Sequence, residues 1–161
     1  MPRLYTVPFT NITSIAGTQD FWEFVGSSNK LIRLKRIVLS CDDSTIATSQ
    51  MFRIAAGMTT ATAALGTGTV AGLNAIDKGD SAAGFTYTTN TTVLGTGTRL
   101  ALYNNAFHAY NGLDENFDTD GRTLAQITAS GTGEGFWVEL LSTVVGTVHF
   151  SGTAWVEETS G

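Results

Sequence analysis

The stretch Leu31-Ile32-Arg33-Leu34-Lys35-Arg36-Ile37-Val38-Leu39-Ser40 decides the fold class. Its first half alternates apolar residues with Arg33 and Lys35, which is the period-2 pattern of a strand with one buried face. Its second half, from Ile37 to Leu39, is apolar on both faces, as is typical of a strand at the centre of a sheet. We therefore predict a central β-strand over this stretch.

Further strand patterns lie on both sides of this one. Asp20 to Val25 alternates in the same way and ends at the turn residues Gly26 to Asn29. The last two patterns flank Val145-Gly146 and predict an antiparallel hairpin. The remaining strands are expected at residues 50–55, 85–89, 99–103, 106–110, 124–128, 136–142 and 147–157. That number of strands predicts one all-β domain over residues 1–161, an antiparallel two-sheet β-sandwich of jelly-roll-like architecture.

Two segments do not fit this pattern of core strands. Residues 1–12 contain Pro8, which removes a ladder donor and favours an edge strand or an extended N-terminal arm. Residues 57–80 mix Gly, Ala and Thr without sustained periodicity, which predicts one long loop. The pentapeptide Leu-Gly-Thr-Gly-Thr occurs at residues 65–69 and 94–98, and we interpret the repeat as shared turn chemistry.

Composition excludes several classes of function. Only 14% of the 161 residues are charged and the net charge is −5 at a pI near 4.8, so direct binding to nucleic acid is not expected. No apolar stretch approaches the length of a membrane helix, and the N-terminus lacks signal-peptide features. A surface so poor in charge predicts that copies or partners cover part of it.

The best site-like cluster is an acidic segment that could surround a hard cation with oxygen atoms, formed by Asp114, Asn116, Asp118 and Asp120. If Asn116 is taken as the first ligand of an EF-hand loop, Ile127 stands at the position that requires the closing carboxylate. An acidic surface loop is therefore the favoured interpretation. The histidines, His108 and His149, are far apart in sequence and have no nucleophile motif beside them. We therefore expect no enzyme activity and no cofactor.

Lys30, Arg33, Lys35 and Arg36 form a basic run on an otherwise acidic chain. Alternation places Arg33 and Lys35 on one strand face. Two interpretations stand: a solvated face, which is favoured, or a surface that docks on an acidic partner.

Several segments of this sequence, spread almost from end to end of the chain, match segments of a known family. They are the strand 31–40, Met51-Phe52-Arg53-Ile54, residues 80–86 with Thr89-Asn90-Thr91-Thr92, Ala106-Phe107, and Ser151-Gly152-Thr153-Ala154-Trp155-Val156-Glu157-Glu158. In these segments the sequence resembles a family of small tailed-bacteriophage proteins found near head genes. It departs from the family at Asp114 to Arg122, where the family often has a proline-rich stretch, and at the Ala- and Thr-rich residues 57–73.

The resemblance implies a jelly-roll-like virion protein, most simply a capsid decoration or cement protein that binds the lattice of the major capsid protein. A homotrimer at a threefold position would fit that role, and the location would be the capsid surface after synthesis in the host cytoplasm. We expect the partner contacts in the arm, the basic strand and the long loop, at Arg3, Tyr5, Phe9, Arg33, Lys35, Thr59, Leu65, Val70 and Leu73.

Alternative functions stay open at this point. A neck, tail or head-fibre component could use the same sandwich. A carbohydrate-binding sandwich could stack sugars on Tyr103, Tyr110, Trp137 or Trp155, although such residues usually pack in cores. A metal-holding cupin is weaker, because clustered His and Glu ligands are lacking.

Overall fold

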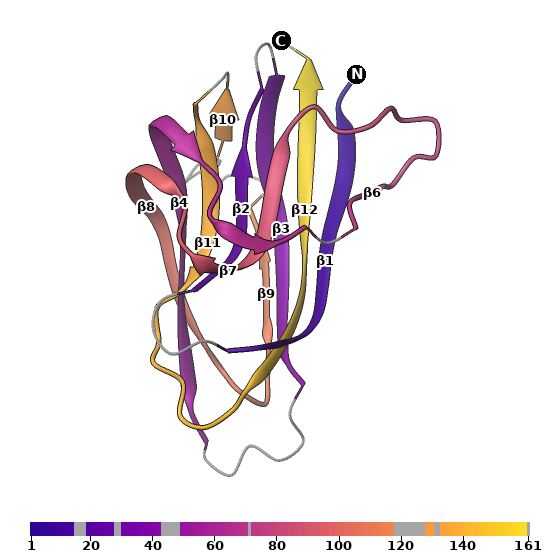
Figure 1. Ribbon diagram of the computed structural model, residues 1–161. Helices are drawn as coiled ribbons and strands as arrows, with labels where there is room; N and C mark the ends of the chain where they lie inside the picture. The colour runs from indigo at the N-terminus through magenta and orange to yellow at the C-terminus, as the bar shows by residue number, and fades with distance from the viewer. Residues whose placement is uncertain are drawn as a thin grey trace.

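The computed structural model describes residues 1–14, 19–27, 30–42, 49–70, 72–117, 128–130 and 133–160, and these residues form strands and connecting loops without a helix (Figure 1). The strands are β1 (Arg3–Thr13), β2 (Gln19–Val25), β3 (Lys30–Cys41), β4 (Met51–Ala64), β5 (Thr67–Thr69), β6 (Asn74–Ala75), β7 (Thr86–Val93), β8 (Thr96–His108), β9 (Leu113–Asn116), β10 (Thr128–Ser130), β11 (Gly135–Leu140) and β12 (His149–Ser160).

The strands make two six-stranded antiparallel sheets. The β1 sheet has the order β10-β3-β12-β1-β6, with β9 also pairing with β3, and the β2 sheet has the order β5-β7-β2-β11-β4-β8. The sets β1-β12-β3-β9/β10 and β2-β11-β4-β8 have the interleaved order of a jelly roll. The predicted all-β, antiparallel, jelly-roll-like sandwich is therefore confirmed.

The predicted closing hairpin is wrong. β11 pairs with β2 and β4 in one sheet, whereas β12 pairs with β3 and β1 in the other. The connection from Leu141 to Val148 is long enough to cross the sandwich, and each of the two strands is flanked on both sides in its own sheet. The two strands are neighbours in sequence, which suggested that they pair with each other. Each instead lies between two other strands of its own sheet, β11 between β2 and β4 and β12 between β3 and β1.

An aromatic core joins the inner faces of the sheets. Trp22 on β2 is fully buried and donates its indole Nε1–H to the carbonyl oxygen of Val7 on β1 over 2.9 Å. Phe9 on β1 lies 4.9 Å from Trp22 between ring centroids, and Phe24 lies 4.6 Å from Phe136. Burial of these rings is the main attraction between the two layers.

The predicted N-terminal arm is wrong, because residues 3–13 form a strand of the β1 sheet. β1 pairs with β12 along its length, and Tyr5, Val7 and Phe9 are buried. Leu4 accepts a hydrogen bond from the Ile76 amide on the opposite edge of β1. Strand alternation then puts the backbone of Pro8 on that same edge beyond the end of β6, where its missing N–H costs no ladder bond.

The predicted long loop over residues 57–80 is also wrong in large part. β4 continues to Ala64 and pairs with β8 as far as Ala64, and β5 and β6 add short pairings to β7 and β1. Bulky residues do not fit at the start of this stretch, since a Cβ on Gly57 would lie 2.1 Å from the carbonyl oxygen of Leu100. Residues 99–103 and 106–110, predicted as two strands, belong mainly to the single strand β8.

Replacing Phe9 with Ala tests whether the N-terminal segment is core. Phe9 is 5% exposed and contacts Phe21 and Trp22, so Phe9→Ala should lower the free energy of unfolding by about 3–5 kcal/mol. The adjacent Thr10 is exposed, and Thr10→Ala should stay within about 0.5 kcal/mol. Urea unfolding measures both; equal, small effects would mean that the segment is an arm after all.

Candidate functional site

The residues expected to contact a partner differ in how far the structure exposes their side chains. Tyr5, Phe9 and Thr59 are 0%, 5% and 7% exposed, so their side chains belong to the folded interior and we remove them from the contact set. Val70 is 71% exposed, whereas Leu73 packs against the core. The structure brings Arg3 and Lys35 together on the outer face of the β1 sheet.

A groove of about 430 Å³ lies on that outer face, across β1, β12 and β3. Its lining includes Arg3, Leu4, Lys35, Arg36, Trp155 and Glu157, and we call it the Trp155 groove. The guanidinium carbon of Arg36 lies 5.1 Å from the ring centroid of Trp155, a cation–π contact. Of the four aromatic residues considered for sugar stacking, Trp155 is the one in this groove; Trp137 is 3% exposed.

The basic run carries matched charges on this face. Arg36 bonds both carboxylate oxygens of Asp114, at 2.8 and 2.6 Å. Arg33 and Lys35 both contact Glu157, at 3.4 and 3.6 Å. The favoured expectation of a solvated face fits these pairs, yet surface ion pairs of this kind are weak and exchange partners readily.

The acidic segment does not form a cation site among the residues that the structure describes. Asp114 on β9 is engaged by Arg36, which lowers the pKa of its carboxyl group by a hydrogen bond. Asp118 and Asp120 lie outside the described residues. No group of three potential metal ligands occurs in the described part of the chain.

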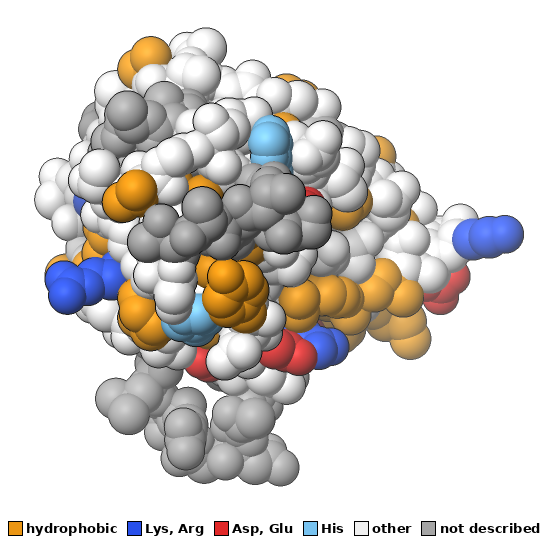
Figure 2. Space-filling model, turned by 90° about the horizontal axis from the view of Figure 1, so that it is seen from below, with side chains coloured by type: hydrophobic (Ala, Val, Ile, Leu, Met, Phe, Trp, Pro, Cys, Tyr) orange, Lys and Arg blue, Asp and Glu red, His pale blue; other side chains and the backbone are white. Residues whose placement is uncertain are grey.

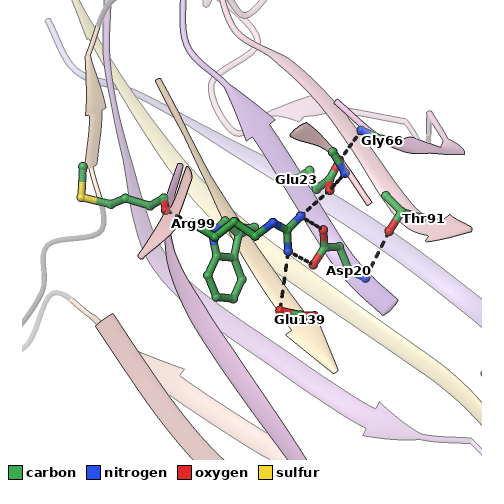
Figure 3. Close-up of polar contacts among 9 residues, drawn as sticks. Asp20, Glu23, Gly66, Thr91, Arg99 and Glu139 are labelled. Atoms are coloured by element: carbon green, nitrogen blue, oxygen red, sulfur yellow. Dashed lines mark hydrogen bonds and ion pairs between the residues drawn. The ribbon is translucent and has the colours of Figure 1, made fainter. Parts of the chain in front are cut away.

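Sequence reasoning missed a cluster of buried charges on the outer face of the β2 sheet (Figure 3). Arg99 on β8 donates from Nη1 to Asp20 Oδ1 over 2.9 Å, and its Nη2 bonds Asp20 Oδ2. The same guanidinium reaches Glu23 at 2.8 Å and Glu139 at 3.5 Å. Asp20 is 0% exposed, so β2, β8 and β11 are joined by a buried charge network that we call the Arg99 cluster.

Glu23 explains the repeated pentapeptide. One carboxylate oxygen accepts the backbone N–H of Gly66 at 2.5 Å, and the other accepts that of Gly95 at 2.6 Å. These are the first glycines of the two Leu-Gly-Thr-Gly-Thr copies. A Cβ on Gly66 would lie 2.0 Å from the carbonyl oxygen of Val93, and one on Gly95 would lie 2.3 Å from that of Ala64. Only glycine lets the two turns approach each other over Glu23.

The Arg99 cluster has no room for a substrate. The space beside it is about 10 Å³, enough for one water at most. The Arg99 guanidinium also stacks 4.9 Å from the ring centroid of Trp137. It therefore fills the position where a bound cation or a reacting group would meet the three carboxylates, and the arrangement ties strands together.

Burial dominates the electrostatics of the cluster. It raises the pKa of Asp20 to about 8, and Glu23 adds to the rise while Arg99 opposes it. Burial also raises the pKa of Glu139, again against the attraction of Arg99. Three carboxylates sharing one guanidinium thus favour retention of a proton within the network.

A serine and a histidine also meet, at Ser49 Oγ and His108 Nε2, 2.5 Å apart. The Nδ1 atom of His108 accepts the backbone N–H of Tyr110 at 3.3 Å, so a neutral ring carries its proton on Nε2 and donates it to Ser49. A histidine in that tautomer cannot act as the base for the serine hydroxyl.

The end of the sandwich that holds this pair exposes apolar side chains. Figure 2 views the molecule from that end and shows hydrophobic side chains between few charged ones. Gln50 bonds both Val145 and the backbone of Ala109, which gathers the loops there. Tyr110 and Val145 are 65% and 63% exposed.

The described residues contain no helix of the length and apolarity needed to span a membrane. No family model matches the chain, and no curated protein is similar to it. Among solved structures it is weakly similar to chains of the T13 IBDV viral particle and of the infectious bursal disease virus Gt strain, each at 11% identity with TM-scores of 0.16 and 0.15. The alignments cover 99% of this chain but only 40% and 41% of those chains, and likeness at this level carries no argument about function.

Arg99→Met should show that the cluster is structural. It leaves three carboxylates buried beside an apolar side chain, and the expected loss of unfolding free energy is about 3–5 kcal/mol. Arg36→Met is the matched control, because Arg36 also pairs with a carboxylate and stacks on a tryptophan but is exposed, so the loss of unfolding free energy should be much smaller. Equal losses in chemical denaturation would contradict a structural role for burial.

The stability of the protein should depend on pH through Asp20. Burial raises the pKa of its carboxyl group to about 8 in the folded chain, whereas the ordinary pKa of 3.8 applies in the unfolded chain. Between these pH values the folded state binds the extra proton, so this group makes stability fall as pH rises.

Asp20→Asn should remove that slope, which urea unfolding from pH 4.5 to 8 measures against wild type. Asp114→Asn is the control, because the pKa of Asp114 is lowered from its ordinary value of 3.8 in the folded chain, so its contribution is lost only at more acidic pH and the slope from pH 4.5 to 8 should stay that of wild type. An unchanged slope in the Asp20→Asn protein would refute the assignment.

Proposed function

We propose that this chain is a structural component of a tailed-bacteriophage virion, a capsid decoration or cement protein that binds the lattice of the major capsid protein. The sequence resemblance suggests this role, and the jelly-roll sandwich is compatible with it. The observation that carries the proposal is the Trp155 groove, a roomy concave surface built on rigid strands and bordered by exchangeable ion pairs.

The contact would use shape and apolar area more than net charge. Trp155 and Leu4 supply aromatic and aliphatic surface to the lining of the groove. A carboxylate from the capsid could replace Glu157 as the partner of Lys35, because Glu157 would keep its contact with Arg33. Many equivalent copies on a lattice would add weak contacts into firm attachment.

The proposed homo-oligomer, a trimer, would cover other apolar surface. β8 forms an edge of its sheet, and Leu100 and Leu102 on it are 53% and 37% exposed. Arg99, the charged residue of the strand in that region, turns to the buried cluster, so this edge presents no charge to oppose association.

Sugar binding is a second candidate, favoured by the partly exposed ring of Trp155, which lines the groove together with Asn116 and Glu157. A sugar would have to displace the Arg36 guanidinium, which already lies over the ring. A neck, tail or head-fibre location would use the same protein surface and differs only in the partner.

The test is binding to particles of the encoding phage that have been stripped of the protein. Wild type, sized by light scattering, should bind saturably and raise the melting temperature of the particles. Trp155→Ala should weaken binding at least about 10-fold, as removal of a central aromatic anchor does. Tyr110→Ala is the matched control, an exposed aromatic at another part of the surface, and should bind normally.

Three results would count against the proposal. A protein that ignores the particles would refute the cement role. Loss of binding in Tyr110→Ala alone would move the contact to the apolar end of the sandwich. Binding of an oligosaccharide that depends on Trp155, without particle binding, would favour the sugar-binding function.

A further inference from the structure

A groove of about 380 Å³ lies where β4 and β8 meet the end of β11. Its lining is formed by Arg53, Ile54, Asn104, Asn105, Ala106 and Leu141. We call it the Arg53 groove. It lies nearer the start of β4 than the Arg99 cluster does, since Arg53 pairs with Ala106 whereas Arg99 pairs with Thr59 further along that strand.

Arg53 differs from the other arginines that the structure describes. Arg3, Arg33, Arg36 and Arg99 each contact a carboxylate of the chain. The side chain of Arg53 is exposed, and its guanidinium has no ion pair or hydrogen bond with any described residue. On a chain with a net charge of −5, this cation is available to an acidic group from outside.

A free carboxamide shares the face of the sheet that carries Arg53. Arg53 lies opposite Ala106, and Asn104 stands two residues before Ala106, so the three side chains point to the same side. Ala106 is small and leaves space between the other two. Asn104 is exposed, and its carboxamide has no hydrogen-bond partner in the described part of the chain. The groove therefore offers a guanidinium fork and a carboxamide donor on one face.

The backbone beneath this cation is held without help from its side chain. The N–H of Arg53 donates to Ser142 Oγ at 2.6 Å, and its carbonyl oxygen accepts the N–H of Leu141 at 2.8 Å. β4 also has β8 on one side and β11 on the other. A ligand would therefore meet a preformed surface and would cost mainly the rotamer freedom of the Arg53 side chain.

Exposed apolar side chains stand near the guanidinium. Met51 precedes Arg53 by two residues on the same face of β4 and is 55% exposed. Leu141 lines the groove and is 42% exposed. A partner that covers both side chains gains from removing apolar surface from water.

We propose that the Arg53 groove binds an acidic side chain of a partner polypeptide, carried on an extended segment whose neighbouring residues are apolar. In this complex the Arg53 guanidinium donates two hydrogen bonds to the carboxylate, and Asn104 Nδ2 donates a third. Apolar side chains of the segment lie against Met51 and Leu141. The inference does not rest on the capsid role, because the Trp155 groove lies on the other sheet.

A carboxylate suits this groove better than a phosphate. Arg53 is the one charged residue among the described residues that line it, and the net charge of −5 opposes a polyanion. A guanidinium binds a planar carboxylate through two parallel hydrogen bonds. A small carboxylate would leave Met51 and Leu141 in water, so a segment that covers them should bind more tightly.

The test titrates the ¹⁵N-labelled protein with the peptide acetyl-Thr-Leu-Asp-Leu-Thr-amide and follows the Arg53 Nε–H and Asn104 side-chain amide signals by NMR. We expect saturable shifts at millimolar peptide. The same peptide with Asn in place of Asp should bind at least about 10-fold more weakly, because it cannot form the charged hydrogen bonds. Arg53→Gln should lower the affinity for the Asp peptide by a similar factor.

Lys78→Gln is the matched control. It removes the same charge from an exposed cation that has no ion pair with the described residues, but Lys78 does not line the groove, so the affinity should stay unchanged. Leu141→Ala should weaken binding of the peptide and leave binding of sodium acetate unchanged. Thermal unfolding should show that Arg53→Gln is folded, since both backbone bonds of Arg53 remain.

Several results would overturn the proposal. Absence of a shift would show that the groove does not bind the segment. Equal binding of the Asp and Asn peptides, or equal losses in Lys78→Gln and Arg53→Gln, would mean that no specific pair forms. Acetate binding as tight as that of the peptide would reduce the groove to a site for small anions. Self-association of wild type in light scattering that Arg53→Gln abolishes would make a second copy of the chain the occupant.

Discussion

One guanidinium holds the outer face of the β2 sheet together. Arg99 contacts Asp20, Glu23 and Glu139 from strands β2 and β11, and without it these carboxylates would be buried beside one another. Glu23 in turn holds the two turns that begin at Gly66 and Gly95. The path of β4 beyond the sandwich edge, the turn into β8 and the cover over this sheet all depend on that network.

The two outer faces of the sandwich differ in how far the chain itself covers them. Around the Arg99 cluster, the face of the β2 sheet is closed by its own chain, with about 10 Å³ left beside the carboxylates, and serves stability. The face of the β1 sheet is left open and carries the Trp155 groove. The side of the sandwich between β1 and β7 carries a second groove, of about 330 Å³, whose lining has no charged residue.

Much of the fold could be predicted from the sequence because alternation is a local signal. The stretch 31–40 forms β3, and its apolar second half lies between β12 and β9 as a central strand should. Pro8 misled the prediction for β1, since one proline cannot show on which edge of a strand its missing N–H will lie. The first part of β4 was predicted as the strand at residues 50–55, but its continuation to Ala64 was taken for a loop because Ala, Gly and Thr show no strand alternation.

The candidate sites were harder to predict. Arg3 and Lys35 were chosen separately and meet in one groove, but the part played by Trp155 needed the pairing of β12 with β3. The repeat of Leu-Gly-Thr-Gly-Thr was the one visible trace of the Arg99 cluster, and its meaning rests on backbone bonds to a glutamate 43 and 72 residues away.

The most direct measurement of the central claim is an electron cryomicroscopy reconstruction of stripped particles of the encoding phage after the purified protein has been added back. A structural virion component that docks through the β1 sheet should appear as ordered density on the particle, with the Trp155 groove buried against it. Particles without added density, or with the protein attached and the Trp155 groove facing solvent, would contradict it.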